Sequence, residues 1–332
     1  MALYEKISKV DEIMGRINTH PEYQQCLLRD EYHALRNEAE KHSLDMELQG
    51  EEPVSKAGDL IHIRDKHRAK AAMRLSETQE YLAKEGINLA TLSTLGYKIA
   101  PINNKHEGFR RELVSFGPFY GEESENIIYK VNDVLSFLQN SSVHPVLRAS
   151  NAHLETVLIH PYMDGNGRAA RLLQNQLLLE RGYPPAIISL EEKREYFKII
   201  GGAIKDRINH KSNFYKKSES ENIFHDFVAS RVLDSAKSVE DSLKSRRMYD
   251  VKLTKVSNFG IVRVLANALR SSGRMSENKG VSVSIDKKNC GRKENLLRIT
   301  GNISQDELRT TLERFSDKYG FSFNADNFKR LC

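Results

Sequence analysis

The stretch His160-Pro-Tyr-Met-Asp-Gly-Asn-Gly-Arg-Ala-Ala-Arg171 decides how the central part of the chain folds. Small and apolar residues recur at helical spacing from Ala149 to His160, and Pro145 suits the first turn of that helix. The pattern from Arg168 to Arg181 predicts a second helix, which the glycine and prolines that follow it end. Gly165-Asn166-Gly167 is therefore predicted to be a turn that opens directly on a helix N-terminus.

This predicted turn has the properties of an anion-binding site. Backbone N–H groups point outward at a helix N-terminus, where the helix dipole favours negative charge. Arg168 and Arg171 oppose that dipole unless an anion is bound in front of them, and arginine pairs bidentately with phosphate. Asp164 offers one carboxylate, which suits a Mg²⁺ held mainly by phosphate oxygens and waters. His160 is a candidate base beside them.

Each of these residues also has an ordinary explanation, because Asn-Gly is a common turn and a histidine before proline can simply end a helix. Two other motifs are excluded. No G-x-x-x-x-G-K-[ST] stretch occurs in the sequence, which excludes a P-loop. Arg168 and Asn175 stand where an EF-hand loop needs ligand oxygens.

A dinucleotide-binding fingerprint is the remaining alternative. Gly165, Gly167 and Ala170 satisfy G-x-G-x-x-A, and residues 186–190 followed by Glu191 have the pattern of a second strand and its ribose-binding acid. Against this alternative, the apolar run at 156–159 continues a helical pattern. Residues that include a proline separate that run from Gly165, where the fingerprint needs a tight turn after a strand.

The stretch His160–Arg171 resembles the motif of Fic-domain proteins, H-P-F-x-[DE]-G-N-G-R-x-x-R, with Tyr162 in place of Phe. His153 lies seven residues before His160, as in many members of that family. Phe109–Phe116 resembles the flap hairpin that holds the target segment, with Arg111, Val114, Ser115 and Phe116 as the docking residues. The resemblance covers roughly residues 95 to 230. It implies a mostly α fold, with a Fic-type helical core and a small β-hairpin flap.

The resemblance also implies an activity, which is transfer of AMP from ATP to a Ser, Thr or Tyr hydroxyl of a target protein, or of the protein itself. His160 would be the general base, and Asp164 would hold Mg²⁺ against the phosphates. Gly165, Asn166 and Gly167 would line the anion hole, with Asn166 donating from its side chain. Arg168 and Arg171 would stabilise the departing pyrophosphate, with Arg171 reaching toward the γ-phosphate.

A second resemblance concerns control of the activity. Many Fic proteins carry an inhibitory helix with the pattern [ST]-x-x-x-E-[GN], whose glutamate pairs with the second motif arginine. Ser43 and Glu47 fit this pattern, whereas Leu48 stands where Gly or Asn is usual. The alternative is that Glu47 is a solvated helix residue in an acidic stretch. If the resemblance holds, the Glu47 carboxylate competes with a phosphate oxygen for one guanidinium.

The 332 residues are enough for two or three domains, and we expect a helical region at 1–90, a catalytic core at 91–235 and a basic domain at 236–332. Mean hydropathy is −0.55 and no apolar run reaches membrane length. The first residues lack an apolar signal core. Cys26, Cys290 and Cys332 have no metal-binding spacing and indicate reduced thiols, so we expect a cytoplasmic protein.

The C-terminal region has a different pattern. Residues 281–285 alternate like a strand, 295–300 indicate its partner, and 304–319 predict a helix, so a small α+β domain is expected. Residues 236–332 carry 20 Lys and Arg against 11 Asp and Glu, a net charge of +9 in a chain of +6. This basicity leaves weak nucleic-acid binding open beside an ordinary solvated surface.

Three further functions stay open at this point. The same site can remove AMP from a modified hydroxyl, in which case Glu47 would be essential rather than inhibitory. The chain can also be a nucleotide-sensing or DNA-binding regulator, although a sensor needs no base at His160. Transfer of another nucleotide or of a phosphate is possible, because the motif residues would bind the phosphates and none of them is expected to contact the base. A homodimer is also open.

Overall fold

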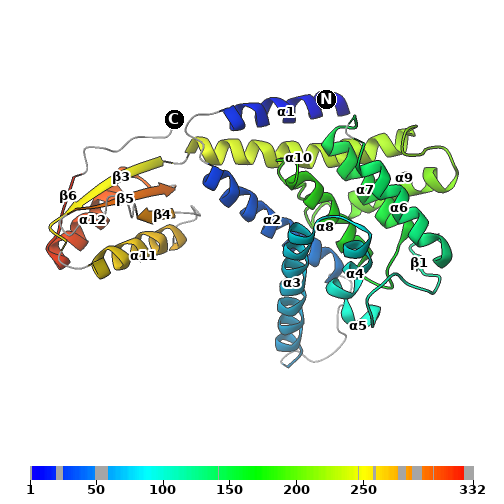
Figure 1. Ribbon diagram of the computed structural model, residues 1–332, viewed down its shortest axis with the longest axis horizontal. Coiled ribbons are helices and arrows are strands. Elements are labelled where there is room, and N and C mark those ends of the chain that lie inside the picture. Colours follow the sequence, from blue (N-terminus) through cyan, green and yellow to red (C-terminus); the bar gives the residue numbers. More distant parts are fainter. Residues whose placement is uncertain are drawn as a thin grey trace. The chain divides into compact units, whose positions relative to one another are not determined.

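The computed structural model describes residues 2–19, 25–48, 59–140, 142–245, 247–256, 259–275, 282–285, 294–301 and 303–324. The chain divides into two compact units, one made of Met1–His20 with Gln24–Val239 and the other containing Glu240–Cys332 (Figure 1). Helix α10 (Glu219–Ser245) passes through the boundary between them.

The first unit is almost entirely helical, which confirms the predicted fold class. Its helices besides α10 are α1 (Leu3–Thr19), α2 (Gln25–Leu48), α3 (Asp59–Glu85), α4 (Leu89–Ile99), α5 (Pro101–Asn104), α6 (Ile127–Leu138), α7 (Pro145–Ile159), α8 (Asn166–Leu179) and α9 (Lys193–Ile208). A short 3-10 turn, η1 (Ser124–Asn126), precedes α6. A two-stranded antiparallel hairpin of β1 (Ser115–Phe116) and β2 (Phe119–Tyr120) completes the unit. The sequence also predicts a break in the N-terminal helical region near Gly50–Gly58, and these residues lie outside the part of the chain that the structure describes.

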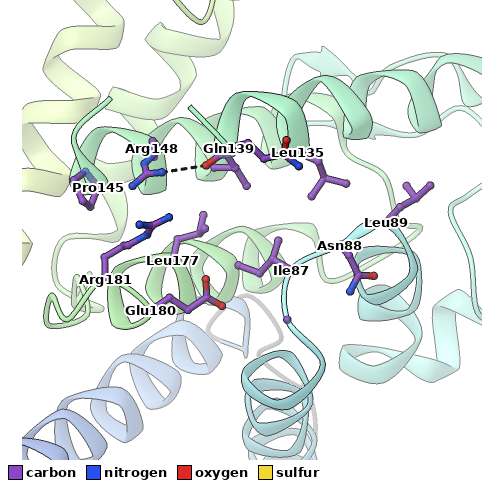
Figure 2. A pocket seen from close by; sticks show the side chains of 12 residues that line it. Ile87, Asn88, Leu89, Leu135, Gln139, Pro145, Arg148, Leu177, Glu180 and Arg181 are labelled. Atoms are coloured by element: carbon purple, nitrogen blue, oxygen red, sulfur yellow. Dashed lines mark hydrogen bonds between the residues drawn. The ribbon is translucent and has the colours of Figure 1, made fainter. Parts of the chain in front are cut away.

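Helices α7 and α8 form the centre of this unit and lie side by side (Figure 1). The motif loop joins the end of α7 to the start of α8. Tyr162 of that loop is buried, and its hydroxyl donates to Leu92 O at 2.5 Å. A Cβ on Gly96 would lie 2.5 Å from the Tyr162 ring, so α4 approaches the loop as closely as a residue without a side chain allows. At the opposite end of the pair a cavity opens between α4, α6, α7 and α8 (Figure 2).

The dinucleotide alternative is wrong. All strand pairs in the described residues are antiparallel, whereas a dinucleotide-binding fold needs a parallel sheet. Residues 186–190 are not a strand, and the apolar run at 156–159 belongs to helix α7. The glycines of the motif therefore open a helix that is entered from another helix.

The second unit is a small α+β fold, as predicted. It runs β3 (Arg247–Thr254), α11 (Phe259–Met275), β4 (Ser282–Ile285), β5 (Glu294–Gly301), α12 (Gln305–Tyr319) and β6 (Ser322–Asn324). The strands pair antiparallel in the order β4-β5-β3-β6, which is the β-α-β-β-α-β arrangement of ferredoxin-like folds. Ser304 caps α12 through a capping box with Glu307.

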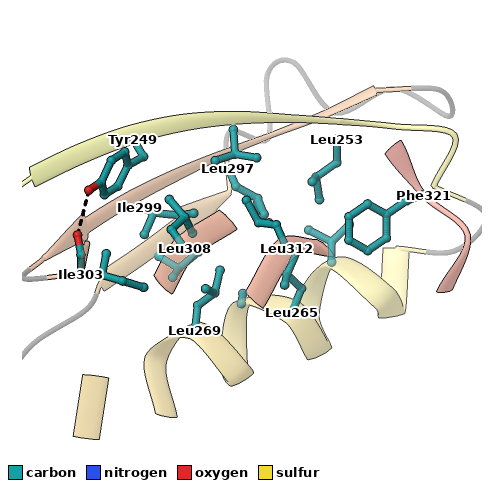
Figure 3. Packing of buried hydrophobic residues seen from close by; sticks show 14 of the residues in the cluster. Tyr249, Leu253, Leu265, Leu269, Leu297, Ile299, Ile303, Leu308, Leu312 and Phe321 are labelled. Carbon is teal, nitrogen blue, oxygen red and sulfur yellow. Dashed lines mark hydrogen bonds between the residues drawn. The ribbon is translucent and has the colours of Figure 1, made fainter. Parts of the chain in front are cut away.

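The core of the second unit lies between the sheet and its two helices. Tyr249, Leu297 and Ile299 of the sheet meet Leu265 and Leu269 of α11, and Leu308 and Leu312 of α12 (Figure 3). The Tyr249 hydroxyl donates to Ile303 O at 2.8 Å. Strands β3 and β6 and helix α11 are not among the predicted elements. The sequence also predicts a turn at Asn289–Gly291, and these residues lie outside the part of the chain that the structure describes.

No described helix combines the length and the apolar character that crossing a membrane requires. The side chain of Cys26, and Cys290 and Cys332, lie outside the part of the chain that the structure describes, so the predicted thiol state has no structural counterpart here.

Candidate active site

His160 follows the last residue of α7, and its backbone takes a left-handed conformation with φ 52°. Its Nδ1 lies 3.2 Å from Val157 O, and its ring stacks on Phe116 with centroids 4.2 Å apart and planes 5° apart. A carbonyl oxygen can only accept a hydrogen bond, so the proton is assigned to Nδ1. The lone pair is therefore on Nε2, which is the atom available as a base.

The protonation state of His160 also suits a base. Burial lowers the pKa of His160 to about 4, against the smaller opposing effect of the Val157 carbonyl. The Arg110 guanidinium lowers the pKa further. The imidazole is consequently neutral near pH 7 and can accept a proton.

Arg110 ties the candidate base to the flap, a role that sequence reasoning missed. Its Nε donates to His160 O at 2.6 Å, its Nη1 donates to Glu112 O at 2.6 Å and its Nη2 donates to Glu122 O at 2.5 Å. Arg110 is 5% exposed, so these bonds are shielded from water. A Cβ on Gly121 would lie 2.5 Å from Arg110 Nη2, so only glycine fits beside this clamp.

The flap is shorter and lies later in the chain than Phe109–Phe116, which corrects the prediction. The strands of this segment are Ser115–Phe116 and Phe119–Tyr120, and the earlier carbonyl of Glu112 accepts from the Arg110 side chain instead of a partner strand. Arg111 and Ser115 are exposed and Val114 is half-buried. The Phe116 ring stacks on His160 and so supports the base, and docking at Phe116 stays a prediction.

The turn after His160 is held by its own side chains. Asp164 Oδ1 accepts from Gly165 N at 2.6 Å and from Arg168 Nη2 at 3.3 Å. Asp164 Oδ2 accepts from Asn103 Nδ2 at 2.7 Å. Gly165 has φ 85°, which glycine adopts without strain. Helix α8 then begins at Asn166, so its first N–H groups face the turn.

The Asn166 side chain does not line the anion hole, contrary to expectation. Its Nδ2 donates to Tyr162 O at 2.8 Å and its Oδ1 accepts from Tyr162 N at 2.9 Å. Asn166 is 3% exposed, so both amide atoms serve to fix the loop. What Asn166 can offer an anion is its backbone N–H at the helix N-terminus.

Ser43 and Glu47, the two residues of the predicted inhibitory pattern, both contact Arg171. Arg171 Nη2 donates to Glu47 Oε1 at 2.8 Å, and Arg171 Nε donates to Ser43 Oγ at 2.8 Å. Both acceptors come from the last turns of α2, which packs on α8. Arg171 is 4% exposed, and its Nη1 has no hydrogen-bond partner among the described residues. Arg171 therefore has bonding capacity left for an anion.

The residues present fit a Mg²⁺ that arrives with phosphate. The described residues contain no cluster of three or more acidic, His or Cys side chains that would hold a metal ion alone. Asp164 supplies one carboxylate, 38% exposed, at the edge of the turn. Mg²⁺ commonly takes one or two protein carboxylates and fills its other positions with phosphate oxygens and waters.

Behind the site, His153 is fully buried among neutral partners. Its Nδ1 lies 2.7 Å from Gln174 Oε1 and its Nε2 lies 2.8 Å from the Tyr196 hydroxyl. Tyr196 is 1% exposed and packs in the core, whereas Phe197 is 48% exposed. Burial lowers the pKa of His153 to about 3.

We expect the free energy of unfolding to fall as the pH decreases from about 6.5 toward 4, because the unfolded chain protonates His153 and His160 while the folded protein keeps them neutral. This stabilising contribution is complete above pH 6.5. Urea unfolding followed by circular dichroism at several pH values measures it. In His153→Gln the loss of stability with acid should be smaller, and equal slopes in both proteins would contradict the assignment.

Residues 95–178 match the profile of the Fic/DOC family, and this part of the chain is a Fic domain. Protein adenylyltransferase fic-1 of Caenorhabditis elegans is 37% identical over 91 residues, which are 26% of this chain and 18% of that protein. Protein adenylyltransferase Fic of Drosophila willistoni is 43% identical over 137 residues, 36% of this chain and 27% of that protein. The chain thus spans well under half the length of these relatives.

A solved structure has the same fold. A Fic domain containing signaling protein from Bacteroides thetaiotaomicron VPI-5482 aligns with a TM-score of 0.54 and 18% identity. The alignment covers 70% of this chain and 97% of that one. The likeness at this identity concerns the fold and not the activity.

Proposed function

We propose that this protein transfers AMP from ATP to a hydroxyl side chain of a target protein. The observation that supports this most directly is the juxtaposition, in one loop, of a neutral histidine and a helix N-terminus flanked by two arginines. A helix N-terminus and arginines bind phosphates, and the histidine has no role in mere binding. The adenylyltransferase names of the relatives support the choice of AMP as the transferred group.

In the proposed reaction, the target hydroxyl oxygen attacks the α-phosphorus of ATP. The bond to the bridging oxygen of the β-phosphate breaks, and pyrophosphate leaves with that electron pair. His160 Nε2 takes the hydroxyl proton, since Nδ1 is engaged with the Val157 carbonyl. The N–H groups at the start of α8 and the Arg168 guanidinium stabilise the charge that grows on the phosphates.

Asp164 would hold Mg²⁺, which neutralises phosphate charge when it is bound. Before that, the Asp164 carboxylate is held in place by Asn103 and by the Gly165 N–H. Together with the bond from Arg168 Nη2, these bonds fix the carboxylate and leave Oδ2 with one acceptor position free. Substrate binding would then need little movement of the loop.

We propose further that Glu47 restrains this reaction. A Cβ on Gly167 would lie 2.9 Å from Glu47 Oε1, so the carboxylate sits directly over the first turn of α8. The same carboxylate bonds to Arg171. A phosphate of ATP would compete with the Glu47 carboxylate for the start of α8 and for Arg171, because each of these two groups attracts an anion.

Incubation with α-labelled ATP, Mg²⁺ and a cell lysate tests the activity. Label on protein that requires His160 would support AMP transfer, whereas γ-label alone would indicate phosphate transfer. Release of AMP from a previously labelled target would instead support the reverse reaction. If none of these products forms while the protein still binds nucleotide, the site would be a nucleotide sensor and not an enzyme active site.

The flap supports a proposal about how the target is held. Gly121 N donates to Val114 O at 2.9 Å inside the hairpin, and hydrogen bonds alternate along antiparallel strands. The backbone N–H and carbonyl of Ser115 therefore face outward, where an extended peptide can pair with them.

We expect Ser115→Pro to abolish target labelling and to leave nucleotide binding unchanged, because proline removes the outward N–H and spares the bonds inside the hairpin. Ser115→Ala keeps that N–H and serves as the matched control. Labelling assays and calorimetric titration with ATP give the two readouts. Normal labelling by Ser115→Pro would refute docking on this edge.

No nucleic-acid role is proposed for the second unit. In its described residues Tyr249 and Phe321 are buried in the core, and Phe315, Tyr319 and Phe323 pack against that core, so the aromatic side chains serve packing rather than a base-stacking surface. The homodimer, the cytoplasmic location and the three-part division of the chain stay predictions.

A further inference from the structure

A cavity of about 350 Å³ lies at the end of the α7–α8 pair opposite the motif loop. It is lined by the start of α4, the end of α6, the first turn of α7 and the end of α8 (Figure 2). Its volume is at the lower end of the range of small-molecule sites, roughly 300–1,000 Å³. None of the motif residues lines it, so it is separate from the proposed ATP site.

Two arginines, Arg148 of α7 and Arg181 after α8, line this cavity together. Figure 2 shows their guanidinium groups facing one another. Arg148 is 6% exposed, and its Nη1 donates to Leu138 O at 3.1 Å. Burial lowers the pKa of Arg148, and the nearby Arg181 guanidinium lowers it further.

The protein does not neutralise this pair of like charges. Among the described residues, neither Arg148 nor Arg181 forms an ion pair with a carboxylate. Glu180 is the single acidic residue of the lining, and its Oε1 accepts from Gln176 Nε2 at 2.9 Å. Two guanidinium groups that face each other without an anion repel one another, and the repulsion costs more because the Arg148 side chain is buried. A bound anion would remove the repulsion.

Part of the remaining lining is apolar and incompletely covered, beside the polar residues Asn88 and Gln139. Ile87, Leu89, Leu135, Leu138 and Leu177 are only partly buried at the edge of the main core. Figure 2 shows Ile87, Leu135 and Leu177 beside the arginines, on the side toward α4. A ligand that fills the cavity would therefore need an apolar body behind its charged group.

We propose that this cavity is a binding site for a small organic acid, with a carboxylate or phosphate bound between Arg148 and Arg181 and a ring or branched chain against the leucines. The cavity is large enough for a ring with its acidic group. Arginine recognises both kinds of anion bidentately, so the two acids share one chemistry.

Fluorine NMR with the full chain tests the site. The probes are 4-fluorobenzoate and 4-fluorophenyl phosphate, and the uncharged control is 4-fluorobenzyl alcohol. We expect the acids to show line broadening that the alcohol lacks. A nonhydrolysable ATP analogue with Mg²⁺ is present, so that the phosphate probe reports on this cavity and not on the motif. Binding of the phosphate alone would assign the site to phosphate esters, and binding of benzoate would extend it to carboxylates.

Arg181→Gln removes one guanidinium from an exposed position and is expected to weaken the binding of the acids about tenfold, the effect of one charge-assisted hydrogen bond. Arg309→Gln is the matched control, because it makes the same charge change on the exposed face of α12 in the second unit. Absence of acid binding, equal binding of the alcohol, or equal weakening by both variants would overturn the proposal. These outcomes leave the proposed AMP transfer untouched.

Discussion

Glu47→Gly is expected to raise AMP transfer roughly ten- to a hundredfold, the range that loss of one charge-assisted hydrogen bond of about 1.5–3 kcal/mol implies. Glu47 Oε1 occupies Arg171 Nη2 at 2.8 Å and stands over Gly167 at the start of α8. Both positions are where a phosphate would bind. Because the Glu47 side chain is 36% exposed, solvent screening favours the lower part of that range.

Incorporation of label from α-labelled ATP measures this effect. Glu38→Gly is the matched control, since it removes another glutamate from the exposed face of α2. Glu47→Gln separates charge from bulk, because it keeps the size of the side chain and should release only part of the restraint. Unchanged transfer by Glu47→Gly would remove Glu47 from this role. A loss of AMP release from a modified target would point to the reverse reaction.

Much of the site could be predicted because its parts are close in sequence. Pro145 and Gly182 bracket the two helices, and the helical spacing between them predicts that His160 ends the first helix and that Arg168 lies in the first turn of the second. The contact of Glu47 with Arg171 spans 124 residues, and no local pattern predicts it. It was predicted only through the resemblance to Fic proteins.

The Arg110 clamp could not be predicted in the same way. Its partners are backbone carbonyls, among them His160 O at a separation of 50 residues. Every residue has a backbone carbonyl, so the residue types at these positions do not indicate the contact. The shift of the flap has the same origin. Once Arg110 bonds to Glu112 O and Glu122 O, the hairpin can pair only between those points. A buried side chain thus decides where the strands begin.

The second unit shows a different limit. Val251 and Leu253 alternate along β3, and Val262, Leu265 and Leu269 follow helical spacing in α11, so the local signals were present. They were missed because each short segment is ambiguous until the sheet shows which face is buried. Strand β6 has three residues, too few for any pattern.

His160→Ala is expected to lower AMP transfer by about 10²–10⁴-fold, which is the usual contribution of a general base. ATP binding should be kept, because the phosphates are held by α8 and its arginines rather than by the imidazole. The transfer rate with labelled ATP and a calorimetric titration with ATP distinguish these two effects. Burial keeps the pKa of His160 at about 4, so the transfer rate of the wild type should also lack an acidic limb due to His160 between pH 6 and 8.

The substitution must not simply disturb the loop. His160 has φ 52°, a conformation that strains alanine but that asparagine tolerates, so His160→Asn is the second variant. If both variants bind ATP and neither transfers AMP, the missing function is proton removal and not loop geometry. Transfer retained by His160→Asn would mean that another group takes the proton. In that case the stacking of Phe116 and the clamp of Arg110 on His160 would serve only to hold the flap against the motif loop.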